Sequence, residues 1–205
     1  MKPSEIIFGT RNLHKLQEVQ TKLAKGTNLK IWALSEFDRV PEVEEDLPDL
    51  EGNSRKKAEI WASILKRWVL ADDSGLMVDA LQGRPGVYSA RYSGEKATAE
   101  QNNTKLLQEM STIPDPERTA RFRCVLTLAS PEGMIFQVSG SLEGKIAMNL
   151  RGHHGFGYDP LFILKKNKRF EIRLAELSLE KKNKISHRAR ALEQFMLHWK
   201  RLPKI

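Results

Sequence analysis

Two adjacent carboxylates next to an apolar run are the first residues of this 205-residue chain that could do chemistry. Asp72 and Asp73 follow the run from Trp68 to Ala71, which we expect to be a short buried strand that stops at Asp72. Two such carboxylates repel each other and resist burial unless a cation or hydrogen bonds stabilise them. One could ligate a hard metal ion while the other orients or deprotonates a water molecule. The alternative is an Asx turn that caps the strand.

A second candidate is the phosphate-binding segment Gly9-Thr10-Arg11-Asn12-Leu13-His14-Lys15. It lies between a predicted strand at residues 5–8 and a predicted helix whose apolar residues recur near helical spacing. The start of a helix offers unpaired backbone N–H groups to an anion, and Lys15 lies about one turn inside it. The alternative is an ordinary helix start capped by Thr or Asn.

Two segments nearer the C-terminus could contact a flat, anionic ligand. Glycines on both sides of Phe156 allow close backbone approach to a flat ring, on which Phe156 could stack, and Asp159 could accept a hydrogen bond from that ring. Ser186 is a plausible helix N-cap, which places His187 and Arg188 in the first turn. Basic residues there oppose the helix dipole, and a bound anion would relieve this conflict. The alternatives are a turn over the core and a solvated basic linker.

The charge is unevenly distributed along the chain, whose formal net charge is +8. Residues 165–205 contain 13 basic and four acidic side chains, whereas residues 36–51 contain eight acidic side chains and one arginine. The basic region could bind nucleic acid or a polyphosphate, or could be a solvated surface. A nucleic-acid-binding protein gains little from the acidic block. The two regions of opposite charge suit an enzyme in which carboxylates hold a divalent cation and Lys and Arg side chains bind a polyphosphate next to it.

The elements that would position these residues indicate one domain, residues 1–205, of the mixed α/β class. We expect strands at residues 29–34 and 68–71, a hairpin of strands 121–129 and 134–141, and helices at residues 53–68, 98–110 and 186–201. The single cysteine, Cys124, cannot form an internal disulfide and suits a reducing compartment. No apolar run approaches the roughly 18 residues of a membrane helix. We expect a cytoplasmic protein without a signal peptide and without a membrane partner.

Taken together, the segments resemble the inosine triphosphate pyrophosphatase family over nearly the whole chain. The matching stretches are Ala71 to Leu76, Val78 to Leu81, Gly83 to Gly94, Gly155 to Phe162, Ala175 to Ser178 and Ile185 to Arg188. The resemblance implies a twisted mixed β-sheet flanked by helices, in two lobes with the active-site cleft between them. It also implies a homodimer. The implied reaction is Mg²⁺-dependent hydrolysis of non-standard purine nucleoside triphosphates (ITP, dITP, XTP) to the monophosphate and pyrophosphate.

The resemblance also assigns roles to residues. Asp73 matches the metal-bound proton acceptor and Glu45 the second metal carboxylate, with Glu44 as its competitor. Arg11, Leu13 and His14 belong to the matched phosphate loop, in which Arg11 replaces the family's usual Gly. The triphosphate-facing positions are Thr10, Asn12, Lys15, Lys57, Ser74 and Lys182. The base pocket is formed by Phe156, Gly157, Tyr158 and Asp159, with His187 and Arg188 closing over the base and phosphates.

Two other functions remain open at this point. One is a pyrophosphatase of broad specificity, which would also hydrolyse modified pyrimidine or standard nucleoside triphosphates. The other is a nucleic-acid-binding protein that uses the basic C-terminal region, which would leave the acidic block and Asp72-Asp73 unexplained. A site that offers hydrogen-bond donors to the carbonyl at position 6 of hypoxanthine or xanthine would reject adenine, which carries an amino group there.

Overall fold

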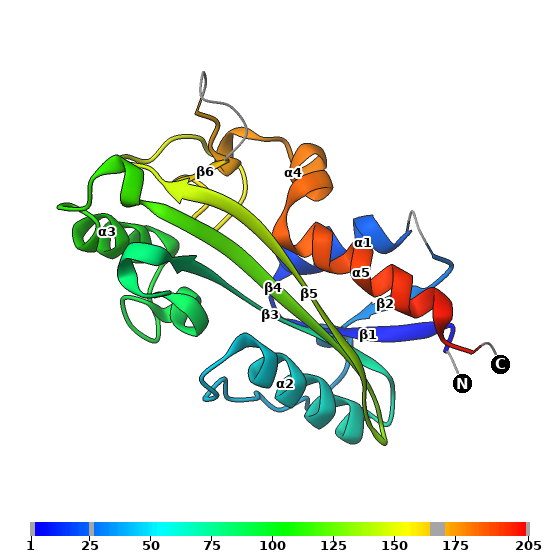
Figure 1. The fold of residues 1–205 in the computed structure, drawn as a ribbon. Helices are drawn as coiled ribbons and strands as arrows, with labels where there is room; N and C mark the ends of the chain where they lie inside the picture. The colour runs from blue at the N-terminus through cyan, green and yellow to red at the C-terminus, as the bar shows by residue number, and fades with distance from the viewer. Residues whose placement is uncertain (1–2, 25–26, 165–170, 204–205) are drawn as a thin grey trace. The chain divides into compact units, whose positions relative to one another are not determined.

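The computed structural model describes residues 3–24, 27–164 and 171–203 as a mixed β-sheet with flanking helices (Figure 1). The strand order is β2-β1-β3-β4-β5-β6; β1 pairs in parallel with β2 and β3, whereas β5 and β6 are antiparallel. This confirms the predicted fold class. The strands are β1 (Glu5–Gly9), β2 (Lys30–Ala33), β3 (Val69–Val78), β4 (Thr119–Ser130), β5 (Gly133–Ile146) and β6 (Phe162–Leu164). The helices are α1 (Leu13–Ala24), α2 (Leu50–Leu65), α3 (Ala99–Glu109), α4 (Leu179–Ile185) and α5 (His187–Arg201).

The chain divides into two compact units, which agrees with the two lobes implied by the family resemblance. The first unit consists of Met1–Asp73, Cys124–Gly140 and His187–Ile205, and the second of Ser74–Arg123 and Ser141–Ser186. Strands β3, β4 and β5 contribute residues to both units. That residues 1–205 form one domain stays a prediction. None of the helices described for residues 3–24, 27–164 and 171–203 is both long and apolar enough to cross a membrane.

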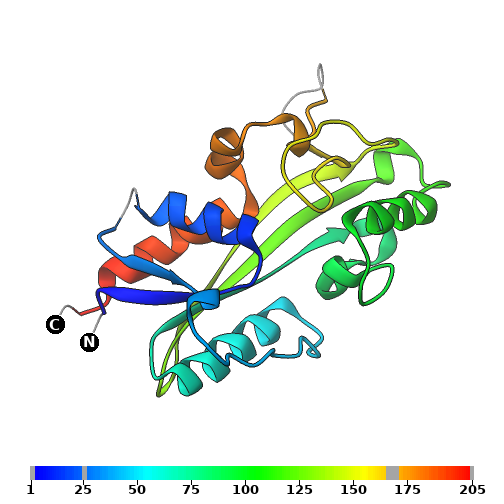
Figure 2. The ribbon, with the colours of Figure 1, turned by 180° about the vertical axis from the view of Figure 1, so that it is seen from behind.

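The first unit has helices on both faces of its part of the sheet. Helices α1 and α5 lie side by side on one face and α2 covers the other (Figures 1 and 2). Because successive strand residues point to opposite faces, Ile6 and Phe8 pack against α1 and α5, whereas Ile7 packs against α2. Gly140 of β5 lets α5 approach closely, since a Cβ there would overlap the backbone of His187 and Ala191.

The second unit has its own core, formed by the ends of the long strands and by α3. Leu76 and Val78 of β3 pack there, and the rings of Phe122 and Phe162 lie 4.6 Å apart. Helix α3 begins after Thr98, whose side chain accepts a hydrogen bond from the Gln101 N–H in a capping box. The predicted N-cap is thereby confirmed.

The predicted end of the strand at Asp72 is wrong: β3 continues to Val78, so the two aspartates lie inside a strand and not in an Asx turn. The strand can continue through both carboxylates because cationic side chains stabilise them in place, as described below. Helix α2 also begins earlier than predicted. Its N-cap is Asp49, whose carboxylate accepts from the Gly52 N–H at 2.6 Å. Strand β6 and helix α4 were not predicted.

Candidate active site

Asp72 is the buried centre of an ion-pair network in the first unit. Its carboxylate lies 3.0 Å from Lys15 Nζ and 3.1 Å from Arg188 Nη2, and its side chain is 1% exposed. Burial alone would raise the pKa of this carboxyl, but Lys15 and Arg188 hold it well below its ordinary value. Asp72 is therefore ionised at any physiological pH and acts as an anchor for the two cations.

Arg188 lies between two buried carboxylates. It contacts Glu18 of α1 as well as Asp72, and its side chain is 1% exposed. Burial opposes its charge, but Asp72 and other partners raise the pKa of the guanidinium. The unfavourable position of Arg188 in the first turn of α5 is thus compensated by the protein's own carboxylates. Glu18 was not predicted as a site residue; its only signal in the sequence is that it lies one helical turn after Lys15.

Asp73 faces a buried lysine that it shares with Glu45. Lys57 Nζ contacts the Glu45 carboxylate, lies 3.5 Å from Asp73 Oδ1 and donates to the Asp72 backbone oxygen at 2.7 Å. Burial raises the pKa of Asp73 to about 6; the Lys57 ammonium opposes this shift and the Glu45 carboxylate adds to it. A carboxylate that titrates near neutral pH suits a proton acceptor. Lys57 itself has a raised pKa, because Asp73 and Glu45 outweigh the effect of burial.

The oxygen donors around Lys57 fit a divalent cation that is shared with a substrate. Glu45 and Asp73 both approach one ammonium group, so their carboxylates converge on a single positive charge. Among residues 3–24, 27–164 and 171–203, no three Asp, Glu, His or Cys side chains form a metal-binding group. Mg²⁺ in phosphate-transfer sites is held by one or two carboxylates with substrate phosphates and water. Of the two candidates for the second ligand, Glu45 is half-buried at this site, whereas Glu44 is exposed.

The phosphate loop is organised by its own side chains. Asn12 Oδ1 accepts hydrogen bonds from the N–H groups of His14 at 3.0 Å and Lys15 at 3.2 Å, so Asn12 caps α1. Thr10 Oγ1 accepts from the Asn12 N–H. The capped helix start, which the sequence offered as the alternative to a phosphate site, is present, and it holds Lys15 in the turn from which its ammonium reaches Asp72. Leu13 and His14 are exposed beside the loop.

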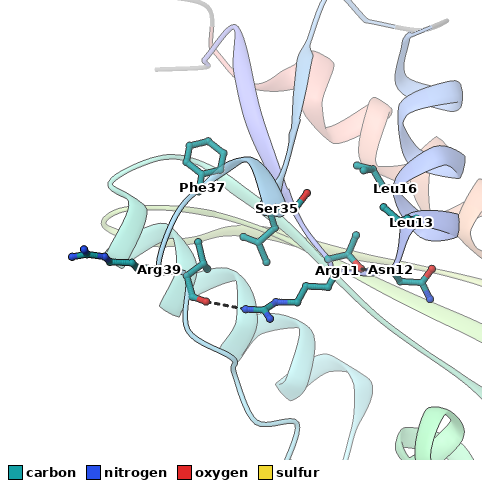
Figure 3. A pocket seen from close by; sticks show the side chains of 10 residues that line it. Arg11, Asn12, Leu13, Leu16, Ser35, Phe37 and Arg39 are labelled. Carbon is teal, nitrogen blue, oxygen red and sulfur yellow. Dashed lines mark hydrogen bonds between the residues drawn. The ribbon is translucent and has the colours of Figure 1, made fainter.

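A pocket of about 360 Å³ opens beside the phosphate loop (Figure 3). Arg11 crosses it and donates from Nη2 to the Val40 backbone oxygen at 2.9 Å, with Glu42 3.4 Å from Nη1. Arg11 therefore connects the phosphate loop to the acidic segment that carries Glu45. The pocket is lined by Thr10, Arg11, Asn12, Leu13, Leu16, Leu34, Ser35, Phe37, Arg39 and Val40.

In the second unit, Asp159 organises the aromatic glycine loop. Its Oδ2 accepts from the Phe156 N–H at 3.0 Å and from Lys182 Nζ at 2.6 Å, and Lys182 Nζ lies 4.2 Å from the centre of the Phe156 ring. Gly155 has φ of +82°, and a Cβ there would overlap Asp159 Oδ2, so only glycine fits. Lys182, assigned by resemblance to the triphosphate, thus lies with Phe156 and Asp159.

The remaining site residues differ in how much of the side chain is accessible. Tyr158 is buried in the core of the second unit, with its hydroxyl donating to the Ser89 backbone oxygen at 2.9 Å. Gly157 and Ser74 are half-buried in the same unit, and His187 is buried at the start of α5 in the first. The first unit thus holds the candidate phosphate and metal ligands. The second unit holds Ser74 and the candidate base-binding residues.

Comparisons with known proteins agree over nearly the whole chain. The model of the Ham1 family matches residues 6–198. The chain is 50% identical to the dITP/XTP pyrophosphatase of Geobacter sulfurreducens over 92% of this chain and 93% of that protein. It is 46% identical to the dITP/XTP pyrophosphatase of Listeria monocytogenes over 93% of this chain and 92% of that protein.

Solved structures give the same result. A HAM1 protein from Coxiella burnetii has a TM-score of 0.86 at 36% identity and covers 98% of this chain and 100% of its own. A nucleoside-triphosphatase / dITP/XTP pyrophosphatase from Mycobacterium abscessus has a TM-score of 0.76 at 37% identity, with 93% and 98% covered. The family resemblance inferred from the motifs is confirmed, and the chain belongs to the Ham1 family.

Proposed function

We propose that this protein hydrolyses non-standard purine nucleoside triphosphates, including dITP, XTP and ITP, to the monophosphate and pyrophosphate. Relatives at 50% and 46% identity over more than nine-tenths of the chain carry the name dITP/XTP pyrophosphatase. The observation in the site that supports the reaction best is the placement of two carboxylates, Asp73 and Glu45, on either side of the buried Lys57 ammonium. A carboxylate at this place can orient an attacking water and accept its proton.

The proposed reaction is attack of water on the α-phosphorus. Asp73 accepts a proton from the water, the new P–O bond forms, and the bond between the α-phosphorus and the bridging oxygen breaks with its electron pair on pyrophosphate. Lys15, held at the start of α1, binds phosphate oxygens and offsets the growing charge of the leaving group. Asp72 keeps Lys15 in place and stays ionised throughout.

Glu45 and Asp73 would hold the divalent cation, with Lys57 keeping the two carboxylates together. The bound cation would supply Lewis-acid polarisation of the phosphate and neutralise charge on the pyrophosphate. We propose Mg²⁺ as this ion, on the strength of the family resemblance and of the hard oxygen donors. The same resemblance supports a homodimer in the cytoplasm. Light scattering during size-exclusion chromatography tests the dimer.

Recognition of the nucleobase is assigned to the loop of the second unit. The half-buried Phe156 ring offers a stacking surface, and Lys182 and Asp159 place charge beside it. His187 and Arg188 stay proposed recognition residues through their backbone or side chains. A donor directed at position 6 would match hypoxanthine and xanthine and would be left unpaired by adenine, which discriminates strongly.

The decisive experiment measures pyrophosphate and monophosphate from ITP, dITP, XTP, dUTP, ATP and GTP with Mg²⁺. We expect turnover of the first three to exceed that of ATP by at least about 100-fold, the range that an unpaired buried polar group allows. Comparable rates for ATP and ITP would replace the proposal with a broad-specificity pyrophosphatase. Asp73→Asn should abolish turnover and keep the fold, whereas Asp115→Asn, at an exposed ion pair with Lys145, is the matched control. Oligonucleotide binding that survives Asp73→Asn, without turnover in the wild type, would favour a nucleic-acid-binding protein.

A further inference from the structure

Ser89 is a junction of hydrogen bonds in the second unit. Its Oγ accepts from the Leu76 N–H of β3 at 2.9 Å and donates to the Gly86 backbone oxygen at 2.6 Å. Its backbone oxygen accepts from the Tyr158 hydroxyl at 2.9 Å. One residue therefore bonds to β3 through its side chain and to the aromatic glycine loop through its main chain.

The segment that carries Ser89 is tightly packed against β3. A Cβ at Gly75 would overlap the Gly86 carbonyl oxygen and would lie 3.0 Å from Ser89 Oγ. The segment of residues 86–91 thus rests directly on the backbone of β3, two residues after Asp73 in the chain. The backbones of the two segments are in direct contact, and a close-packed protein interior resists even small shifts of such a contact.

The other end of this connection is equally fixed. Tyr158 is 4% exposed within the core of the second unit, and the preceding Gly157 carbonyl accepts from Asn103 Nδ2 of α3 at 3.0 Å. The following residue, Asp159, holds Phe156 and Lys182 as described above. Consecutive residues of the loop are therefore tied to the scaffold at the position where the candidate base-binding groups are displayed.

We propose that Ser89 and Tyr158 are positioning residues that hold the base-binding loop, Gly155 to Asp159, in a fixed place relative to the part of β3 that follows Asp73 and Ser74. This inference rests on the proposed function. Neither side chain touches the reacting atoms; together they fix where the loop presents its base-binding groups. Selectivity for the 6-carbonyl base then depends on a hydrogen bond that does not contact the substrate.

The principal test is Tyr158→Phe, which removes only the hydroxyl that bonds to Ser89. The matched control is Tyr92→Phe. Tyr92 is 8% exposed in the same core, and its hydroxyl donates to Glu109 of α3 at 2.6 Å and not to Ser89. Both variants lose one hydroxyl from one core, so a merely structural effect should appear in both. The readouts are kcat and KM for ITP and ATP, together with the thermal unfolding temperature.

We expect Tyr158→Phe to lower the ratio of kcat/KM for ITP over ATP by about tenfold, mainly through KM for ITP, since small misplacements of a binding group cost this much or more. Tyr92→Phe should leave the ratio within about twofold, the size of an effect with no change in recognition. An unchanged ratio in Tyr158→Phe, with selective wild-type turnover, would overturn the inference and leave the proposed function intact. A wild type without ITP turnover would overturn both.

A second arm uses Ser89, so that the conclusion does not depend on one variant folding. Ser89→Ala removes the bonds to Leu76 and Gly86 but keeps the carbonyl that receives Tyr158. If the two residues act as one connection, the double variant should lose no more selectivity than the more damaging single variant. Ser89→Thr keeps a hydroxyl, so it should retain most of the selectivity that Ser89→Ala loses. Fully additive losses in the double variant would show two independent effects and would contradict the proposal.

Discussion

Arg188 Nη2 and Asp72 Oδ2 lie 3.1 Å apart, and each side chain is only 1% exposed. A buried pair of this kind is not by itself strong support for stability, because desolvation offsets much of the attraction. Its importance is that neither charge can be removed alone. Glu18 and Asp72 both depend on the same guanidinium, which joins α1, β3 and α5.

Arg188→Met should therefore destabilise the protein strongly. It leaves two buried carboxylates without their shared cation, and the free energy of unfolding should fall by about 3–5 kcal/mol. The measurement is urea denaturation followed by circular dichroism. Arg190→Met, at an exposed position of the same helix, is the control and should change stability by less than about 0.5 kcal/mol. A small loss in Arg188→Met would mean that the carboxylates are solvated or take up protons at little cost.

Asp73→Asn should stabilise the metal-free protein while abolishing turnover. The folded-state pKa of Asp73, about 6, lies above its ordinary value of 3.8. A group with a raised folded pKa contributes stability that is present below its unfolded pKa and is lost as the pH rises through the folded one. The gain from the substitution should thus be on the order of 1–3 kcal/mol at pH 7.5 and nearly absent at pH 4. Denaturation curves of both proteins at the two pH values provide the check; equal differences at both would refute the assignment.

Glu45→Gln should weaken the dependence on Mg²⁺ selectively. We expect the Mg²⁺ concentration that gives half-maximal activity to rise by at least about tenfold, because one of two anionic oxygen ligands becomes neutral. Glu44→Gln is a control one residue away, at an exposed position, and should stay within about twofold of the wild type. Titration of activity with Mg²⁺ after treatment with EDTA measures both. Equal effects of the two substitutions would remove Glu45 from the metal site.

Cys124 should be unreactive until the protein unfolds. It is fully buried in β4, and burial raises the pKa of its thiol to about 12, so little thiolate forms at neutral pH. A thiol reagent should modify it at the rate of unfolding and quickly in 8 M urea, which serves as the positive control. Rapid modification under native conditions would show that the face of the sheet covered by α1 and α5 opens locally.

The helix caps and the amphipathic helices could be predicted from short stretches of sequence. The caps at Asn12 and Thr98 and the apolar periodicity of α1 and α5 are properties of short segments, and the structure has them where expected. The continuation of β3 through Asp72 was not predictable in this way. It depends on Lys15 and Arg188, which lie far from Asp72 in the chain.

The candidate site shows the same division. The motifs identified the residue types that bind phosphate, metal and base, but they did not show which side chains pair with one another. Glu18 is an ordinary acidic helix residue in the sequence, and only the fold brings it to Arg188. Likewise, Tyr158 stands in an aromatic glycine loop, and nothing in its neighbours indicates that its hydroxyl turns inward to Ser89.

The discontinuous make-up of the first unit has a consequence for biosynthesis. Its strands β1 and β3 and its helix α1 leave the ribosome early, but α5 is translated last among its elements. Until α5 emerges, Glu18 and Asp72 have no guanidinium to share, and the faces of Val19 and Leu23 have no helix to cover them. The core of this unit therefore cannot be completed before α5 has been synthesised. A nascent chain arrested before His187 should therefore be cleaved by a protease more readily than one that includes α5.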